Sequence, residues 1–344
     1  MIRIEDIKFD EDYYDLLIRF LNKTIGLKLG YYQRRHVEKR IKSRMIRVNC
    51  YTLGSYYRYI LETPIEIENF LKSFNINYST FFRNWEFYEQ FQDLIIKSMN
   101  YRKTQLFSDF HPNPERKYKT KNKKKSKVVE NKTNKKININ QKLQSKISVE
   151  KFIKNSSLFK KLRNFSTFKG NVNIWSCPCS TGEEPYSIAI IIDNLKKQIP
   201  QFPKFRIIAS DIDENAIKRA KIGIYNEGST KNISKYYEEK YFLKKKEGFG
   251  FKYIINEKIK EKVEFHNEDV MEIHQTSLFY DIIFCRYLLI YINRENRNKF
   301  LRIIENKLSP GGLLFIGKTE TLFKSQQPHF KLADPKNNIY MKTS

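Results

Sequence analysis

Cysteines and long apolar runs are both scarce in this 344-residue sequence. The four cysteines, Cys50, Cys177, Cys179 and Cys285, are too few and too scattered to form a disulfide framework. No apolar run reaches the roughly 18 residues that a membrane span needs. Residues 1–17 are acidic and lack the apolar core of a signal peptide, so we expect a cytoplasmic protein without membrane insertion.

Two further absences concern ligands. Cys177 and Cys179 have no second cysteine pair at the spacing of a zinc site, and small side chains packed in a tight turn explain them, so no metal is expected. The Gly-x-Gly-x-x-Gly fingerprint that binds a dinucleotide pyrophosphate is also missing.

Acidic residues are outnumbered, because 38 Asp and Glu stand against 65 Lys and Arg, for a formal net charge of +27. Such a charge suits nucleic acid, an anionic membrane or an acidic protein. Residues 103–148 hold 14 Lys and Arg but 3 Asp and Glu, with few aromatic side chains that could stack on bases. We therefore expect residues 101–168 to be a Lys-rich, partly disordered insert, and we expect no nucleic-acid partner.

The segments before the insert have helical spacing. Residues 1–76 predict an N-terminal all-helical domain, and residues 77–100 predict a linker helix that begins near Thr80 after a cap at Asn77 or Ser79.

A helix expected at about 32–48 carries seven cations against the lone acid Glu38. They are Arg34, Arg35, Lys39, Arg40, Lys42, Arg44 and Arg47. This face is either solvated or suited to an acidic helical partner.

Residues 169–344 alternate strand and helix. Strands are expected at 171–177, 205–211, 280–286 and 313–317, and helices at 183–197, 214–222 and 294–308. This order predicts an α/β fold with a mostly parallel, doubly wound sheet. Short strands around a Gly-rich turn at about 241–265 predict a small inserted antiparallel β-subdomain.

Polar residues follow the strands, at the sheet edge where α/β proteins bind ligands. A helix that starts with Glu183-Glu184 repels phosphate, whereas one of these carboxylates can face a cation and the other can sit on the helix dipole. Asp211 ends the next strand, where a carboxylate can hold two ribose hydroxyls. Ribose plus a cationic group without phosphate describes S-adenosylmethionine.

Six segments, in this order, resemble the chemotaxis receptor methyltransferases, the CheR family. They are "GLKLGYYQRRHVEKRIKSRM" (26–45), "TFFR" (80–83), "WSCPCSTGEEPYSIA" (175–189), "ASDIDENAIKRAKIGIY" (209–225), "FCRYLLIYI" (284–292) and "LSPGGLLFIGKTE" (308–320). The resemblance implies a Rossmann-like class I methyltransferase domain and methyl transfer from S-adenosylmethionine to glutamate side chains of methyl-accepting chemoreceptors, forming methyl esters that tune receptor signalling.

The resemblance also implies site residues and partners. Cofactor contacts carry over onto Asn77, Ser79, Arg83, Glu183, Asp211, Asn267, Glu268, Arg286 and Tyr287, and roles near the methyl group onto Arg83 and Tyr291. The implied partners are acidic cytoplasmic receptor helices and a receptor tail peptide at the β-subdomain. Because glutamate is already ionised near neutral pH, no general base is expected.

One departure bears on the site, because Tyr287 stands where the family usually has Asn. It leaves open an adaptor that binds receptors or S-adenosylmethionine without turnover. A methyltransferase for nucleic acid is a second alternative, which only the charge supports.

Overall fold

The computed structural model describes residues 7, 10–25, 28–74, 79–98, 171–197, 202–272, 278–322 and 329–343. The expected Lys-rich insert and the cofactor contact expected at Asn77 lie outside these residues. Within the described ranges, no helix is long and apolar enough to cross a membrane.

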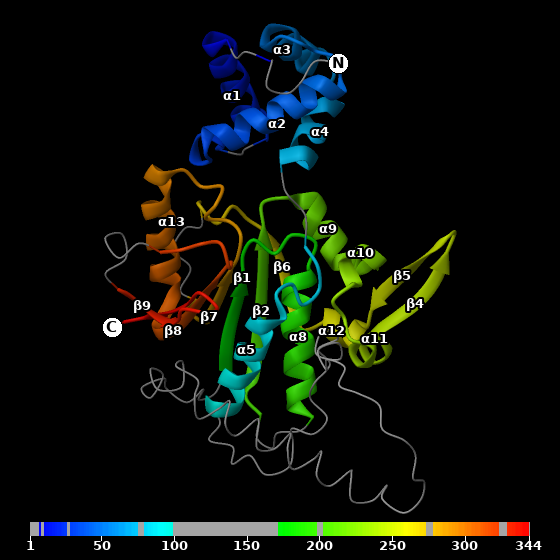
Figure 1. Ribbon diagram of the computed structural model, residues 1–344, viewed down its shortest axis with the longest axis vertical. Helices are drawn as coiled ribbons and strands as arrows, with labels where there is room; N and C mark the ends of the chain where they lie inside the picture. The colour runs from blue at the N-terminus through cyan, green and yellow to red at the C-terminus, as the bar shows by residue number, and fades with distance from the viewer. Residues whose placement is uncertain are drawn as a thin grey trace, which may run out of the picture.

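Four α-helices and one short 3-10 helix form the N-terminal domain at the top of Figure 1. They are α1 (Glu11–Ile25), η2 (Leu29–Tyr31), α2 (Arg34–Arg47), α3 (Leu53–Glu62) and α4 (Ile65–Phe74). Each presents an apolar stripe to one shared core, in which Leu17, Ile41, Tyr56 and Phe70 are fully buried.

The seven-cation face expected on α2 is smaller in the structure. Arg44 lies in the core and forms a two-pronged ion pair with Glu66, with Nη2–Oε2 2.6 Å and Nε–Oε1 2.8 Å. Arg34 is exposed and pairs with Glu11 and Glu38. The periodicity placed Arg44 with the surface cations, but Glu66 on α4 draws it inward because a buried carboxylate needs a partner.

A seven-stranded sheet organises the larger domain in the order β6-β2-β1-β7-β8-β10-β9. Its strands are β1 (Asn171–Ser176), β2 (Lys204–Asp211), β6 (Val263–Asn267), β7 (Tyr280–Cys285), β8 (Leu308–Ile316), β9 (Phe330–Asp334) and β10 (Ile339–Lys342). The first five strands of this order pair in parallel, and β10 pairs antiparallel with β8 and β9. The order reverses between β1 and β7, which marks the edge where ligands bind.

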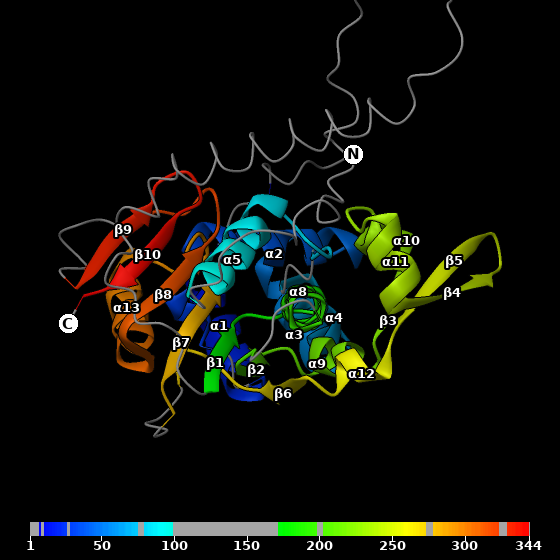
Figure 2. The same ribbon diagram turned by 90° about the horizontal axis from the view of Figure 1, so that it is seen from below.

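Helices cover both faces of the sheet, as Figure 2 shows. Helices α5 (Trp85–Ser98) and α8 (Glu183–Lys196) pack on one face, and α13 (Arg294–Lys307) packs on the other. Helix α9 (Glu214–Ile222) follows β2. The mostly parallel, doubly wound sheet expected from the sequence is confirmed.

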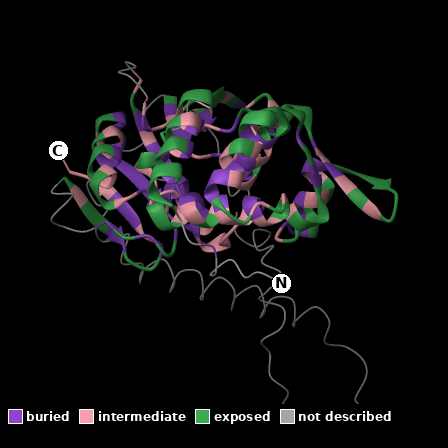
Figure 3. Ribbon diagram, turned by 90° about the horizontal axis from the view of Figure 1, so that it is seen from above, coloured by how far each residue is buried: buried purple, intermediate pink, exposed green. Residues whose placement is uncertain are grey.

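A second sheet projects from the domain beside α8 as a narrow wing (Figures 1 and 3). Its order is β3-β5-β4, all antiparallel, and short helices flank it. The elements are β3 (Ile224–Asn226), α10 (Glu227–Thr230), α11 (Lys235–Tyr241), β4 (Phe242–Glu247), β5 (Gly250–Ile255) and α12 (Glu257–Lys260).

The bounds of this subdomain differ from the expected 241–265 at both ends. Ile224 already pairs with Ile254, so the small sheet begins earlier. Strand β6 instead joins the main sheet beside β2. Its apolar Val263 is buried there, and no local pattern distinguishes that strand from the two hairpin strands before it.

The helix expected to begin near Thr80 begins at Trp85 instead. Phe82 and Asn84 adopt positive φ angles of 52° and 59°, which a helix does not allow. The Phe81 N–H donates to the Ser229 carbonyl at 2.9 Å, and the Phe82 N–H donates to Ser187 Oγ at 3.0 Å. Tertiary hydrogen bonds thus replace the first helical turn, and residues 80–84 form a tight loop over the sheet edge.

Candidate functional site

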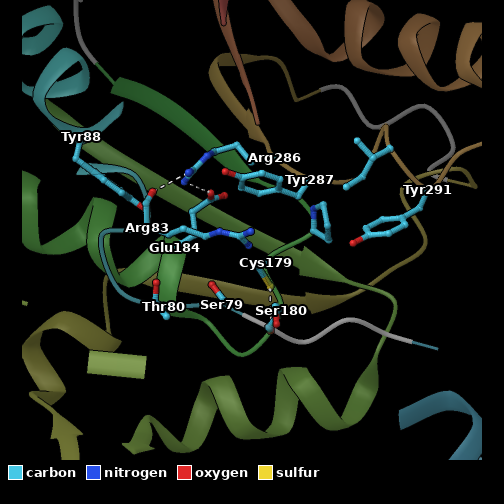
Figure 4. A pocket seen from close by; sticks show the side chains of 12 residues that line it. Ser79, Thr80, Arg83, Tyr88, Cys179, Ser180, Glu184, Arg286, Tyr287 and Tyr291 are labelled. Carbon is cyan, nitrogen blue, oxygen red and sulfur yellow. Dashed lines mark hydrogen bonds and ion pairs between the residues drawn. The ribbon is translucent and has the colours of Figure 1, made fainter. Parts of the chain in front are cut away.

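A cavity lies at the carboxyl ends of β1 and β7, beneath the N-terminal domain (Figure 4). It is formed by the segment before and at the start of α5, the loop after β1 and the turn after β7. The lining residues are Ser79, Thr80, Arg83, Tyr88, Pro178, Cys179, Ser180, Glu184, Arg286, Tyr287, Ile290 and Tyr291.

Five of the site residues expected from the sequence line this cavity: Ser79, Arg83, Arg286, Tyr287 and Tyr291. Four do not: Glu183, Asp211, Asn267 and Glu268. The cavity therefore brings together the contacts from the linker and from β7, and the remaining strand-end residues lie along the same sheet edge.

Glu184 replaces Glu183 as the carboxylate at the cavity. Glu183 is buried and accepts hydrogen bonds from Thr181 Oγ1 at 2.7 Å and Ser229 Oγ at 3.0 Å. Glu184 is turned into the cavity, where it meets Arg286 with Oε2–Nη1 3.0 Å. Adjacent helical residues point about 100° apart, so only one of the two glutamates can face a ligand.

The Glu184–Arg286 pair leaves hydrogen-bonding capacity unused. Ser176 Oγ donates to the second oxygen of Glu184 at 2.7 Å, and Arg286 Nη2 donates to the Arg83 carbonyl at 2.7 Å. The Nε atom of Arg286 is buried and has no hydrogen-bond partner among the described residues. A buried donor of this kind is costly unless a ligand accepts from it.

Asp211 ends β2, one strand away from the cavity, and its side chain hydrogen-bonds the loop that follows β1. Its carboxylate accepts from the Ser180 N–H at 2.7 Å and the Asp213 N–H at 3.0 Å. Burial raises the pKa of Asp211 to about 6, with these hydrogen bonds opposing the rise. On the next strand, Asn267 Nδ2 donates to the Asp211 carbonyl at 3.0 Å, and the Glu268 N–H donates to the same oxygen at 3.0 Å.

Tyr291 connects the two domains at the rim of the cavity. Its carbonyl accepts from the Gln33 N–H at 2.7 Å, and its ring centroid lies 4.7 Å from that of His36. Burial raises the pKa of the Tyr291 hydroxyl, while the positive charges of Arg40 and Arg83 lower it. Both cations therefore lie close enough to act on this hydroxyl.

Arg40 does not line the cavity, but it is a charged neighbour of Tyr291 that the sequence did not assign to the site. Burial lowers its pKa, and its Nε has no hydrogen-bond partner among the described residues. Burial and the charge of Arg40 together lower the pKa of His36 to about 4, so His36 is neutral near pH 7. The helical spacing of Gln33, His36 and Arg40 shows that they share a face, but only the domain contact identifies it as the inner one.

These groups fit S-adenosylmethionine. Its amino-acid end carries one ammonium and one carboxylate, and the cavity offers Glu184 beside Arg286, whose Nε is unpaired within the described chain. Its ribose carries two hydroxyls, and Asp211 provides a carboxylate at the end of the adjacent strand. Strands in a sheet lie about 4.8 Å apart, so β7, β1, β2 and β6 form a row that an extended ligand can follow.

Comparison with known families agrees with this geometry. Residues 142–339 match the family described as CheR methyltransferase, SAM binding domain, and residues 12–74 match its all-alpha domain. The chain belongs to the CheR methyltransferase family. S-adenosylmethionine is accordingly the cofactor of this CheR chain, and the N-terminal helices are the family's own second domain.

Curated relatives match either nearly the whole chain or a little under half of it. A chemotaxis protein methyltransferase of Listeria monocytogenes is 22% identical over 340 residues, which cover 99% of this chain and 100% of the relative. Chemotaxis protein methyltransferase 2 of Vibrio cholerae is 35% identical over 154 residues, 44% of this chain and 52% of the relative. A chemotaxis protein methyltransferase of Salmonella typhimurium is 32% identical over 152 residues, which cover 44% of this chain and 52% of the relative. The CheR chain is thus a methyltransferase of chemotaxis.

Proposed function

We propose that the protein transfers the methyl group of S-adenosylmethionine to glutamate side chains of chemoreceptors and forms methyl esters. The observation that carries the proposal is that Arg83 and Tyr291 line one cavity, while the positive charge of Arg40 acts on the Tyr291 hydroxyl from the N-terminal domain. Two cations and a hydroxyl suit a carboxylate nucleophile, because each can donate a hydrogen bond to it.

The chemistry needs orientation rather than proton transfer. When bound, the cofactor supplies a methyl group activated by its sulfonium. A glutamate carboxylate is ionised near neutral pH, so nothing has to deprotonate it. Glu184 is the one acid among the lining residues, and it is already paired with Arg286. His36 lies beside Tyr291 as a neutral ring, but the reaction gives it no proton to accept because the substrate carboxylate is already ionised.

The lining residues can provide that orientation. Arg83 and the Tyr291 hydroxyl hold one oxygen of the incoming carboxylate, so that the other oxygen can attack in line. Arg40 adds positive charge from the N-terminal domain and draws the substrate toward the cavity rim.

The proposed substrate surface is an acidic helix of the receptor. On α2, Arg35 and Lys39 are exposed and lie beside the inner face that carries His36 and Arg40. Their charge supports docking of an acidic partner next to the cavity. Among the described strands β4 pairs only with β5, and it carries exposed Lys244, Lys245 and Lys246, which supports a receptor tail peptide at its other edge.

The test is transfer of labelled methyl groups from S-adenosylmethionine to receptor-rich membranes. We expect labelled receptor whose label is released by mild base, because carboxyl methyl esters hydrolyse in base while methyl groups on nitrogen do not. Arg83→Ala should lower the rate by on the order of 100-fold at saturating cofactor, since the carboxylate is no longer aligned. Lys218→Ala, an exposed change on α9, serves as the control.

Three outcomes contradict the proposal. Cofactor binding without any labelling would identify an adaptor, and base-stable label would identify a different acceptor atom. Label transferred to RNA or DNA in preference to receptor would identify a nucleic-acid methyltransferase.

A further inference from the structure

Tyr287 is held in an unusual backbone conformation directly above the cavity. Its φ angle is +64°, which non-glycine residues rarely adopt. Its N–H donates to Glu320 Oε2 at 2.7 Å, and the same oxygen accepts from the Gly317 N–H at 2.6 Å. A side chain at Gly317 would place its Cβ 2.9 Å from the Tyr287 ring, so the glycine leaves room for the ring.

The ring that this backbone fixes carries a cation on its face. The guanidinium carbon of Arg83 lies 3.8 Å from the ring centroid of Tyr287, within the range of a strong cation–π contact (Figure 4). The Tyr287 hydroxyl hydrogen-bonds Asn84 Oδ1, and Arg286 Nη2 donates to the same atom at 3.0 Å. Tyr287 therefore contacts Arg83 through its ring and Asn84 through its hydroxyl.

These contacts help to fix the conformation of residues 80–84, which local interactions alone do not favour. Residues 80–84 include two non-glycine residues with positive φ, and such conformations persist only where the surroundings impose them. A long arginine side chain also loses rotamer freedom when a substrate orders it. Because the Tyr287 ring already restricts the Arg83 side chain, less conformational entropy is lost when the substrate binds.

We propose that Tyr287 is a positioning residue whose ring holds the Arg83 guanidinium over the cavity before the substrate binds. This rests on the proposed function, in which Arg83 orients the substrate carboxylate. It assigns Tyr287 a role in the rate of transfer, whereas a direct contact to the cofactor would give it a role in cofactor affinity.

Variants separate the ring from the hydroxyl. Tyr287→Leu keeps bulk but removes the aromatic face, and we expect the single-turnover rate at saturating cofactor to fall on the order of tenfold. The dissociation constant for S-adenosylmethionine, measured by calorimetry, should stay within about twofold of wild type, because in this proposal the ring acts on Arg83 rather than on the cofactor. Tyr287→Phe keeps the ring and should retain a rate within about threefold of wild type.

A double-mutant cycle tests whether the ring acts through Arg83. In an Arg83→Ala background, Tyr287→Leu should produce no further loss of rate, because the residue that it positions is absent. Equal losses in both backgrounds would overturn the proposal. So would a Tyr287→Leu protein with a normal saturated rate and a weakened affinity for the cofactor.

A second readout does not depend on methyl transfer. In the ligand-free protein, a guanidinium stacked on a ring gives an Nε–Hε nuclear magnetic resonance signal shifted upfield by the ring current. We expect this shift for Arg83 in wild type and in Tyr287→Phe, and its loss in Tyr287→Leu. An unshifted signal in wild type would overturn the positioning role even if receptors are methylated, and a shifted signal supports it even if the proposed substrate is wrong.

Discussion

Glu184 and Arg286 face each other across the floor of the cavity as a buried ion pair, with Oε2 and Nη1 3.0 Å apart. Glu184 is the second residue of α8 and Arg286 follows β7, so the pair joins the first turn of a helix to the end of a strand. Their side chains are only 11% and 2% exposed. Removing one partner therefore leaves a charge in a nearly water-free place.

We predict that Glu184→Gln lowers the free energy of unfolding by about 3 kcal/mol, since it leaves Arg286 buried without its counter-charge. Urea denaturation measures the loss. Glu214→Gln on α9 is the control, because Glu214 forms an exposed pair with Lys218, and its loss should be below about 1 kcal/mol. A similar fall in the free energy of unfolding in both variants would show that the buried pair stabilises the protein no more than the exposed one.

We predict that Asp211→Asn weakens S-adenosylmethionine binding by about 1–3 kcal/mol, because a charged acceptor for two hydroxyls is lost. In wild type, affinity should fall as pH drops through about 6, the pKa to which burial raises Asp211, because the protonated carboxyl is a poorer acceptor. Calorimetry from pH 5 to 8 should show this slope in wild type and none in the variant. A wild-type affinity that does not change with pH would remove Asp211 from the ribose site.

Asp211 also makes the free energy of unfolding depend on pH. Its pKa is higher in the folded protein than the ordinary value of about 3.9, so the folded state binds the proton more tightly. Asp211 therefore lowers the free energy of unfolding as pH rises from about 4 to about 6. Asp211→Asn should lack that loss when the two proteins are unfolded in urea across this pH window.

We predict that Arg44→Gln destabilises the N-terminal domain by about 3 kcal/mol, because Glu66 would stay buried without its counter-charge and with only the Tyr56 hydroxyl donating to it. Arg34→Gln, on the same helix, breaks exposed ion pairs with Glu11 and Glu38 and a cation–π contact with Tyr14, and it should cost about 1 kcal/mol. Urea unfolding followed by circular dichroism compares the two. A larger loss for Arg34→Gln would mean that the core of this domain has been assigned wrongly.

We predict that reversing Arg35, Lys39 and Lys42 to Glu raises the Michaelis constant for receptor and leaves the affinity for S-adenosylmethionine near wild type. Opposite charges mainly speed encounter, and salt screens them. Wild-type methylation should therefore fall as salt rises, and the triple variant should lose most of that dependence. Reversing Lys218, Lys221 and Lys235 changes the net charge equally on other surfaces. The same kinetics in both variants would show that only net charge matters.

The sequence by itself determined most of the elements and the chemistry of the strand ends. The period of the apolar residues predicts α8, α9 and α13 within about two residues, because a buried helix stripe is a local property of the chain. Glu183-Glu184 and Asp211 follow strands whose ends any parallel sheet places at one edge, so the sequence predicts where the ligand binds. Their negative charge indicates that the ligand presents no phosphate there. The six family segments could be recognised for a similar reason, because each is a short run of neighbouring residues whose order along the chain is read directly.

Only the tertiary structure decided which of several neighbouring side chains faces the cavity. Glu184 faces the cavity because Arg286 arrives from β7, and Glu183 turns to Thr181 and Ser229. The charge of Arg40 acts on Tyr291 because the start of α2 packs on that residue, which lies 251 positions later in the chain. The helix after Ser79 starts late because its first amides bond Ser229 and Ser187. Periodicity records which residues share a face, but the partner that buries that face comes from elsewhere in the chain.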